Sequence, residues 1–111
     1  MLTIVFMLTG LLMIGLSIPM IRGKVSPNKW YGFRVKATLE NPDVWYPANV
    51  YAGKLLCATG IITVVAAVVC AFIPGITEES YAITVSVIML GSLFITFFFC
   101  MRYAKSLVSR E

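Results

Sequence analysis

The chain has 111 residues, of which 59% are hydrophobic and only 13% are charged, and its mean hydropathy is +0.90. Soluble domains carry about 25% charged residues, so this composition excludes an ordinary water-soluble protein and indicates a lipid bilayer as the main partner. The net charge of +4 comes from basic residues beside apolar runs, where such residues typically contact lipid headgroups. Because zinc-finger and helix-turn-helix patterns are also missing from the sequence, we expect no direct nucleic-acid partner.

Three uncharged apolar runs, each about 20 residues long, follow one another along the chain at 2–21, 55–73 and 81–101. A helix of about 20 apolar residues crosses a hydrocarbon core of ~30 Å, and it satisfies all of its own backbone polar groups in lipid. The first run lacks the basic start and the small-residue cleavage site of a signal peptide, so we expect it to be retained. The sequence therefore predicts an all-α fold, a bundle of three transmembrane helices.

The predicted bundle is a single membrane domain in which a polar insert separates the first two helices. Pro, Gly, Asn and Lys are frequent in the insert without a helical apolar period, so we expect an ordered but irregular cytoplasmic loop there. The predicted segments are a first span at 2–21, the insert at 22–46, a second span at 47–73, a third span at 81–101 and a tail at 102–111.

Two prolines set the expected start of the second helix. The sequence Asn41-Pro42-Asp43 is typical of a helix start, because Asn caps, Pro fits the first position and Asp favours the positive end of the dipole. Pro47 obstructs the helical turn that precedes it. We therefore expect a single short turn over 42–46 and a new helix beginning near Pro47, and we expect the tail to extend the third helix.

The basic residues predict how the bundle is oriented. All nine Lys and Arg residues fall between the first two apolar runs or after the third, whereas the connection 74–80 contains Glu78 and Glu79 and no base. Basic loops remain in the cytoplasm. We therefore expect a multi-pass protein with its N-terminus outside the cell and its insert and C-terminus in the cytoplasm.

Small residues within the spans indicate how the helices pack. Gly60, Thr63 and Ala67 share one helical face, and small side chains let helix backbones approach closely in lipid. We expect this face to pack on a neighbouring helix. None of the three apolar runs contains a charged residue, which argues against an ion-coupled transporter.

The polar side chains of the insert allow two interpretations. Trp and Tyr rings beside spans favour the headgroup zone, and Asn side chains in turns commonly bond to nearby backbone groups. Alternatively, the amides of Asn28, Asn41 and Asn49 contact a ligand. Gly32 permits a tight turn that holds Arg34 against the bundle, where its guanidinium pairs with a carboxylate or a lipid phosphate.

Residues for catalysis or metal binding are scarce. The chain has no histidine, its three cysteines form no C-x-x-C motif, and the insert offers only Glu40 and Asp43 as acids. Metal sites and nucleophile–base pairs need a richer set of ligands and bases than this. We therefore expect no metal site, no cofactor and no enzymatic activity.

The stretch SPNKWYGFRVKATLENPDVWYPANVYAGKLL, residues 26–56, resembles the core of the SdpI family of small bacterial membrane proteins. The family pattern is Pro-Asn, then Tyr-Gly-Phe/Tyr-Arg, a Thr-bearing turn, Asn, Trp, a second Asn, and Gly-Lys entering a membrane helix. The matching residues here are Pro27, Asn28, Tyr31, Gly32, Phe33, Arg34, Thr38, Leu39, Asn41, Trp45, Asn49, Gly53 and Lys54. The resemblance implies a compact version of that fold in the bacterial plasma membrane, without the extra N-terminal membrane region of longer members.

The best-known role of that family is immunity to a secreted, membrane-active toxin, with relay of toxin presence by holding a repressor at the membrane. The resemblance therefore implies binding of a peptide toxin, and contact with a cytoplasmic repressor. The residues expected to bind are Asn28, Tyr31, Gly32, Arg34, Thr38, Asn41, Trp45, Asn49 and Lys54. The alternative is a small transport or accessory subunit for lipids or small molecules, acting as a homo-oligomer because three helices are too few to enclose a wide path.

Overall fold

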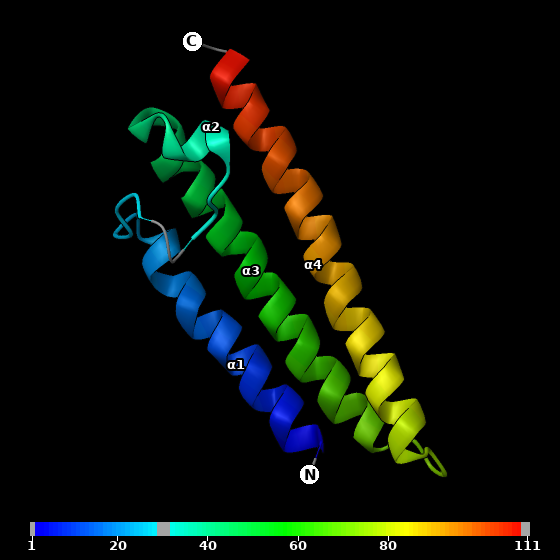
Figure 1. The fold of residues 1–111 in the computed structure, drawn as a ribbon. Coiled ribbons are helices and arrows are strands. Elements are labelled where there is room, and N and C mark those ends of the chain that lie inside the picture. The colour runs from blue at the N-terminus through cyan, green and yellow to red at the C-terminus, as the bar shows by residue number, and fades with distance from the viewer. Residues whose placement is uncertain (1, 29–31, 110–111) are drawn as a thin grey trace.

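The computed structural model describes residues 2–28 and 32–109 of the chain (Figure 1). Its elements are α1 (Leu2–Ile21), α2 (Lys36–Leu39), α3 (Pro42–Ala71) and α4 (Glu78–Ser109). The described residues form no strand, and α1, α3 and α4 are long and apolar enough to cross a membrane. The predicted all-α bundle of three membrane-spanning helices is confirmed.

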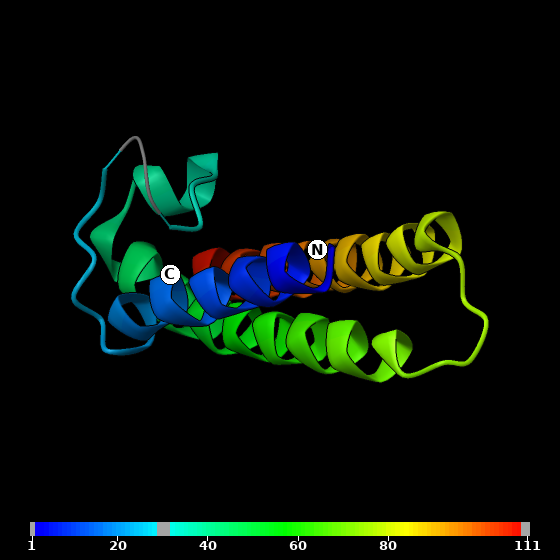
Figure 2. The same ribbon diagram turned by 90° about the horizontal axis from the view of Figure 1, so that it is seen from below.

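The three long helices form an elongated bundle of 55 × 22 × 18 Å with α3 at its centre. Both α1 and α4 pack along α3, but they contact each other little, and Figure 2 shows them on the same side of α3. We call residues 22–41 the α1–α3 connection, and its described residues lie at the same end of the bundle as the C-terminus of α4. α1 and α4 are therefore held together mainly through α3.

The contact between α1 and α3 depends on glycine. A Cβ atom added at Gly10 would lie 2.6 Å from Val64 Cγ2 and 2.7 Å from the carbonyl oxygen of Gly60. Gly60, Thr63 and Ala67 are all buried, and Gly60 faces Ile14 of α1. The predicted packing of this small-residue face on a neighbouring helix is confirmed, and it brings the two backbones close together.

Side-chain hydroxyls link α3 to α4. The hydroxyls of Thr59 and Thr96 lie 3.0 Å apart, and the Tyr81 hydroxyl donates to the carbonyl oxygen of Ala67 at 2.8 Å. The Tyr81 ring also meets Phe6 of α1 edge-on, with centroids 6.1 Å apart. Because lipid offers these polar groups no water, such bonds between helices also keep them satisfied.

The start of α3 differs from the prediction. The cap is as expected, since Asn41 accepts from the Asp43 N–H at 2.9 Å and Pro42 is the first residue of the helix. However, the helix runs without a break from Pro42 to Ala71 and includes Pro47, so the expected separate turn over 42–46 is wrong. A proline removes one backbone hydrogen bond, and burial of Val44 and Trp45 on its N-terminal side holds the first turns in place.

The third long helix also extends beyond its apolar run. α4 begins at Glu78, where Thr77 accepts from the Ser80 N–H at 3.1 Å, and it continues to Ser109. The predicted extension of this helix into the tail is thus confirmed. The 30 residues of α3 and 32 of α4 give lengths of about 45 and 48 Å at 1.5 Å per residue, which exceeds a hydrocarbon core of ~30 Å.

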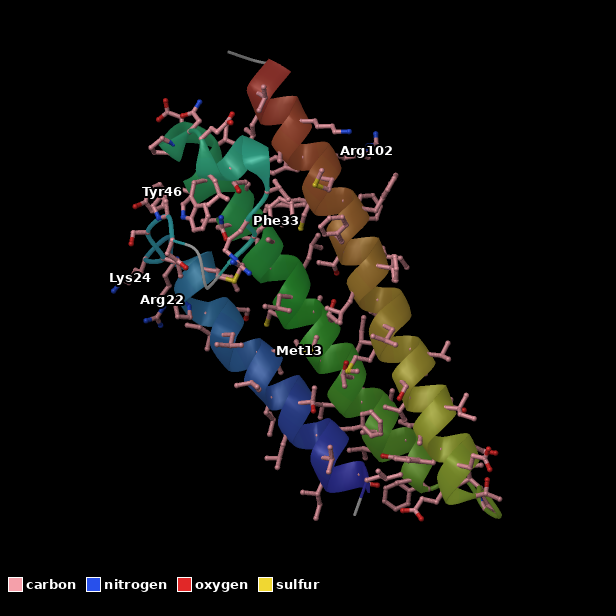
Figure 3. The ribbon with its side chains drawn as sticks, in the orientation of Figure 1. Met13, Arg22, Lys24, Phe33, Tyr46 and Arg102 are labelled. Atoms are coloured by element: carbon pink, nitrogen blue, oxygen red, sulfur yellow. The ribbon has the colours of Figure 1, made fainter. Side chains whose placement is uncertain are left out.

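The two ends of the bundle differ in charge. Figure 3 places Arg22, Lys24 and Arg102 toward the end that carries the α1–α3 connection, whereas Glu78 and Glu79 begin α4 at the opposite end. Between them, exposed Leu, Ile, Val and Phe side chains cover all three long helices. An apolar middle with basic residues at one end is typical of a membrane-spanning bundle. The orientation of the termini in the membrane stays a prediction.

The close contact at Gly10 makes a specific prediction. Replacing Gly10 with Ala forces the new methyl group into Val64 and the backbone of Gly60, so we expect a loss of about 1–3 kcal/mol in unfolding free energy. Gly15→Ala on the same helix is the control, because nothing lies within 4 Å of its Cβ position, and it should be neutral or slightly stabilising. Unfolding in a detergent titration measures both; equal effects would contradict the packing described.

Candidate functional site

The side chain of Asn49 joins α3 to the α1–α3 connection. Its Oδ1 accepts from the Phe33 N–H at 2.6 Å, and its Nδ2 donates to the carbonyl oxygens of Phe33 at 3.3 Å and Trp45 at 2.9 Å. Asn49 is only 2% exposed, so water does not compete for these groups. One side chain therefore satisfies both main-chain polar groups of Phe33.

Gly32 and Thr38 complete this set of contacts around Phe33. We call the contacts of Gly32, Thr38 and Asn49 with the Phe33 region the clamp. Gly32 has φ +104°, and a Cβ added there would lie 2.5 Å from Asn49 Oδ1, so both its backbone angle and its proximity to Asn49 require glycine. The Thr38 hydroxyl accepts from the Val35 N–H at 3.0 Å and lies 3.0 Å from the Phe33 carbonyl oxygen. The predicted unusual backbone angle at Gly32 is confirmed.

Trp45 holds the first half of the connection. Its ring is fully buried, and its indole Nε1–H donates to the carbonyl oxygen of Val25 at 2.7 Å. A buried indole requires such a partner, and here the partner lies 20 residues away in sequence. Trp45 is thus an internal anchor, which differs from the headgroup position that its place beside a span suggested.

The remaining predicted binding residues occupy the edge of the site. Asn41 caps α3, and Asn28 donates to the carbonyl oxygen of Ser26 at 2.8 Å. Arg34 and Lys54 are exposed, and Tyr31 lies outside the described residues. Gly32, Thr38, Trp45 and Asn49 are therefore brought together around Phe33, whereas Asn28 and Asn41 bond to main-chain groups two residues away and Arg34 and Lys54 are exposed.

An apolar cavity of about 310 Å³ lies next to this clamp, and we call it the connection cavity. α1, the connection, α3 and α4 all contribute to its wall. The Phe33 ring meets Phe97 of α4 edge-on, with centroids 6.1 Å apart. Figure 3 shows the Phe33 side chain where the connection approaches α4. The lining residues are Leu16, Met20, Gly32, Phe33, Ala52, Leu56, Leu93, Thr96, Phe97 and Cys100.

Sequence reasoning missed most of this cavity lining. It selected polar residues, whereas the wall is formed mainly by Leu, Met and Phe from segments far apart in sequence. Only Gly32 belongs to both sets. An apolar residue that faces a cavity and one that faces lipid look alike in a sequence, so composition and periodicity carried no signal for Leu93 or Phe97. Phe33 was visible only as a position of the family pattern.

Every buried polar side chain in the described ranges is satisfied. No buried side-chain nitrogen or oxygen there lacks a hydrogen-bond partner, and the buried residues Thr38 and Asn49 bond to main-chain groups. These bonds hold the connection in place. The exposed and apolar residues around the cavity are then the groups available to a ligand.

The clamp predicts a large effect for Asn49→Ala. The Phe33 N–H would lose its acceptor in a part-buried position, which costs about 1–3 kcal/mol, so we expect less folded protein and a lower melting temperature in detergent. Thr9→Ala, which removes an exposed local bond to the Val5 carbonyl oxygen, should change stability by less than about 1 kcal/mol. If Asn49→Ala left stability unchanged, the clamp would not be holding the connection.

Most of the chain matches the model of a protein family. No curated protein and no solved structure matches the chain significantly. Residues 24–104, most of the 111-residue chain, match the SdpI/YfhL protein family. The matched segment covers almost all of the connection, the whole of α3 and most of α4. The three-helix membrane protein described above therefore belongs to the SdpI/YfhL protein family.

Proposed function

We propose that this protein binds a membrane-active peptide in the connection cavity and thereby gives immunity to that peptide. The observation that carries the proposal is the position of Phe33. Its main chain is held by Asn49, and its ring forms part of an apolar cavity between α1, α3 and α4. The part of the chain that resembles the SdpI family thus shapes the cavity itself.

The chemistry of the cavity suits an apolar peptide side chain. Ligand sites are commonly apolar hollows of about 300–1,000 Å³ with a few polar groups, and the volume of about 310 Å³ suits one large side chain better than a whole helix. A toxin already dissolved in the bilayer needs no aqueous route to such a site. Its backbone stays helical, so its N–H and C=O groups keep their hydrogen bonds, while one side chain enters the cavity.

We also propose that the role is binding and not catalysis. Thr96, which lines the cavity, shares a hydrogen bond with the Thr59 hydroxyl, and Thr38 and Asn49 use their side chains to hold main-chain groups. Because Phe33 belongs to the connection, a ligand that shifts its ring also acts on that segment, in which its neighbour Arg34 and, further along, Leu39 are exposed. If this end of the bundle faces the cytoplasm, as its basic residues favour, those neighbours are available to a cytoplasmic partner.

Filling the cavity tests the proposal. Ala52 lines the connection cavity, whereas Ala58 on the same helix is exposed. Susceptible bacteria that produce the wild-type chain are challenged with a panel of apolar membrane-active peptides. We expect protection against at least one of them by the wild type and by Ala58→Leu, and loss of that protection in Ala52→Leu.

Membrane levels of both variants are measured by immunoblot, so that loss of protein is separated from loss of binding. Protection by Ala52→Leu equal to that of the wild type would exclude the cavity as the binding site. Equal killing of cells with and without the wild-type chain, over the whole panel, would defeat the immunity role.

A further inference from the structure

A second pocket lies between α3 and α4, and we call it the tyrosine pocket. It is lined by Tyr51, Phe99, Arg102, Tyr103 and Ser106, and its volume is about 330 Å³. None of these residues lines the connection cavity. The pocket is therefore a separate feature, and the proposed immunity role makes no use of it.

Two stacked rings form the base of this pocket. Tyr51 of α3 and Tyr103 of α4 have ring centroids 4.4 Å apart and an interplanar angle of 23°. Stacking across the two helices restricts both rings. Their phenol hydroxyls, like those of other tyrosines, can donate hydrogen bonds, so the pair presents two donors on fixed supports.

Cations surround the stacked pair. Arg102 lines the pocket and is exposed, and its planar guanidinium suits a phosphate group. Lys54 follows Tyr51 by three residues and Lys105 follows Arg102 by three, so each is a neighbour on the same helix surface, and both are exposed. Of the described residues, those that line the pocket include no carboxylate. The local charge therefore favours an anion.

The level of the pocket in the bundle indicates what kind of anion. Phe97, Phe98 and Phe99 are all exposed apolar rings, and Arg102 follows within one turn of the same helix. This step from apolar to basic surface is expected where hydrocarbon meets headgroups, and tyrosines favour the same level. In Figure 3, Arg102 lies toward the same end of the bundle as Arg22 and Lys24.

The geometry points to the tyrosine pocket as a binding site for the phosphate of an anionic phospholipid. Arg102 pairs with the phosphate oxygens, the phenol hydroxyls of Tyr51 and Tyr103 donate to the headgroup, and the acyl chains run along the Phe99 side of α4. Because the stacked pair joins α3 to α4, a bound lipid also holds these two helices together where they leave the bilayer.

Binding of a defined lipid tests this assignment. The chain, purified in a non-ionic detergent, is titrated with short-chain phosphatidylglycerol, and bound lipid is counted by native mass spectrometry. Phosphatidylcholine with the same acyl chains and inorganic phosphate are titrated in parallel. We expect saturable binding of one phosphatidylglycerol, with both other probes at least about tenfold weaker. The choline cation of phosphatidylcholine cancels the charge of its phosphate and is repelled by the basic residues beside the pocket, and inorganic phosphate lacks the acyl chains.

Matched variants assign the binding to the pocket. Arg102→Gln should weaken phosphatidylglycerol binding at least about tenfold, whereas Arg22→Gln, which removes the same charge at the same end of the bundle, should change it less than about twofold. The double variant Tyr51→Phe with Tyr103→Phe keeps the stacked rings and should weaken binding by several-fold. Should Arg102→Gln fail to fold, Arg102→Lys is compared with Arg22→Lys.

Three results would overturn the assignment. Equal weakening by the Arg22 and Arg102 variants would show attraction to the basic end as a whole. Phosphatidylcholine binding as tightly as phosphatidylglycerol would show that the net negative charge of the lipid is not recognised. Inorganic phosphate binding as tightly as the lipid would show a site for a soluble anion.

Discussion

The backbone of an irregular segment at the edge of a membrane must find hydrogen-bond partners, and in this protein Asn49 supplies them. Its amide bonds to the N–H and the carbonyl oxygen of Phe33. Trp45, which is also in α3, donates to the carbonyl oxygen of Val25. Both anchors belong to α3, so the connection is tied to the helix that also holds α1 and α4. The position of the Phe33 ring, and with it the connection cavity, follows from these bonds.

The cavity also depends on how unevenly the long helices pack. α1 approaches α3 so closely at Gly10 and Gly60 that neither position has room for a methyl group. α1 is held to α3 in this way and touches α4 little. The space between α1 and α4 near the connection is therefore bounded by side chains. Leu16 of α1 faces the cavity but lies outside the segment that matches the family. A wall built partly from this helix allows ligand preference to vary while the clamp is kept.

The connection cavity and the tyrosine pocket divide one end of the bundle between two kinds of chemistry. The first is apolar and lined in part by Phe97 and Cys100, whereas the second contains Arg102, two phenols and a serine. Positions 97 and 100 on one side of α4, and 99, 102, 103 and 106 on the other, follow from the helical period. One helix thus contributes to an apolar pocket on one side and to the proposed headgroup site on the other.

By itself the sequence determined the three helices, because bilayer thickness and backbone bonding leave apolar runs of this length almost no other structure. It also determined local features such as the Asn41 cap and the turn at Gly32, which depend on neighbouring residues. Only the tertiary structure decided that α3 continues through Pro47, since burial of Val44 and Trp45 outweighs one lost hydrogen bond. It alone paired Asn49 with Phe33 and set cavity-facing residues apart from lipid-facing ones, because in a bilayer protein both kinds are apolar and differ only in what they contact.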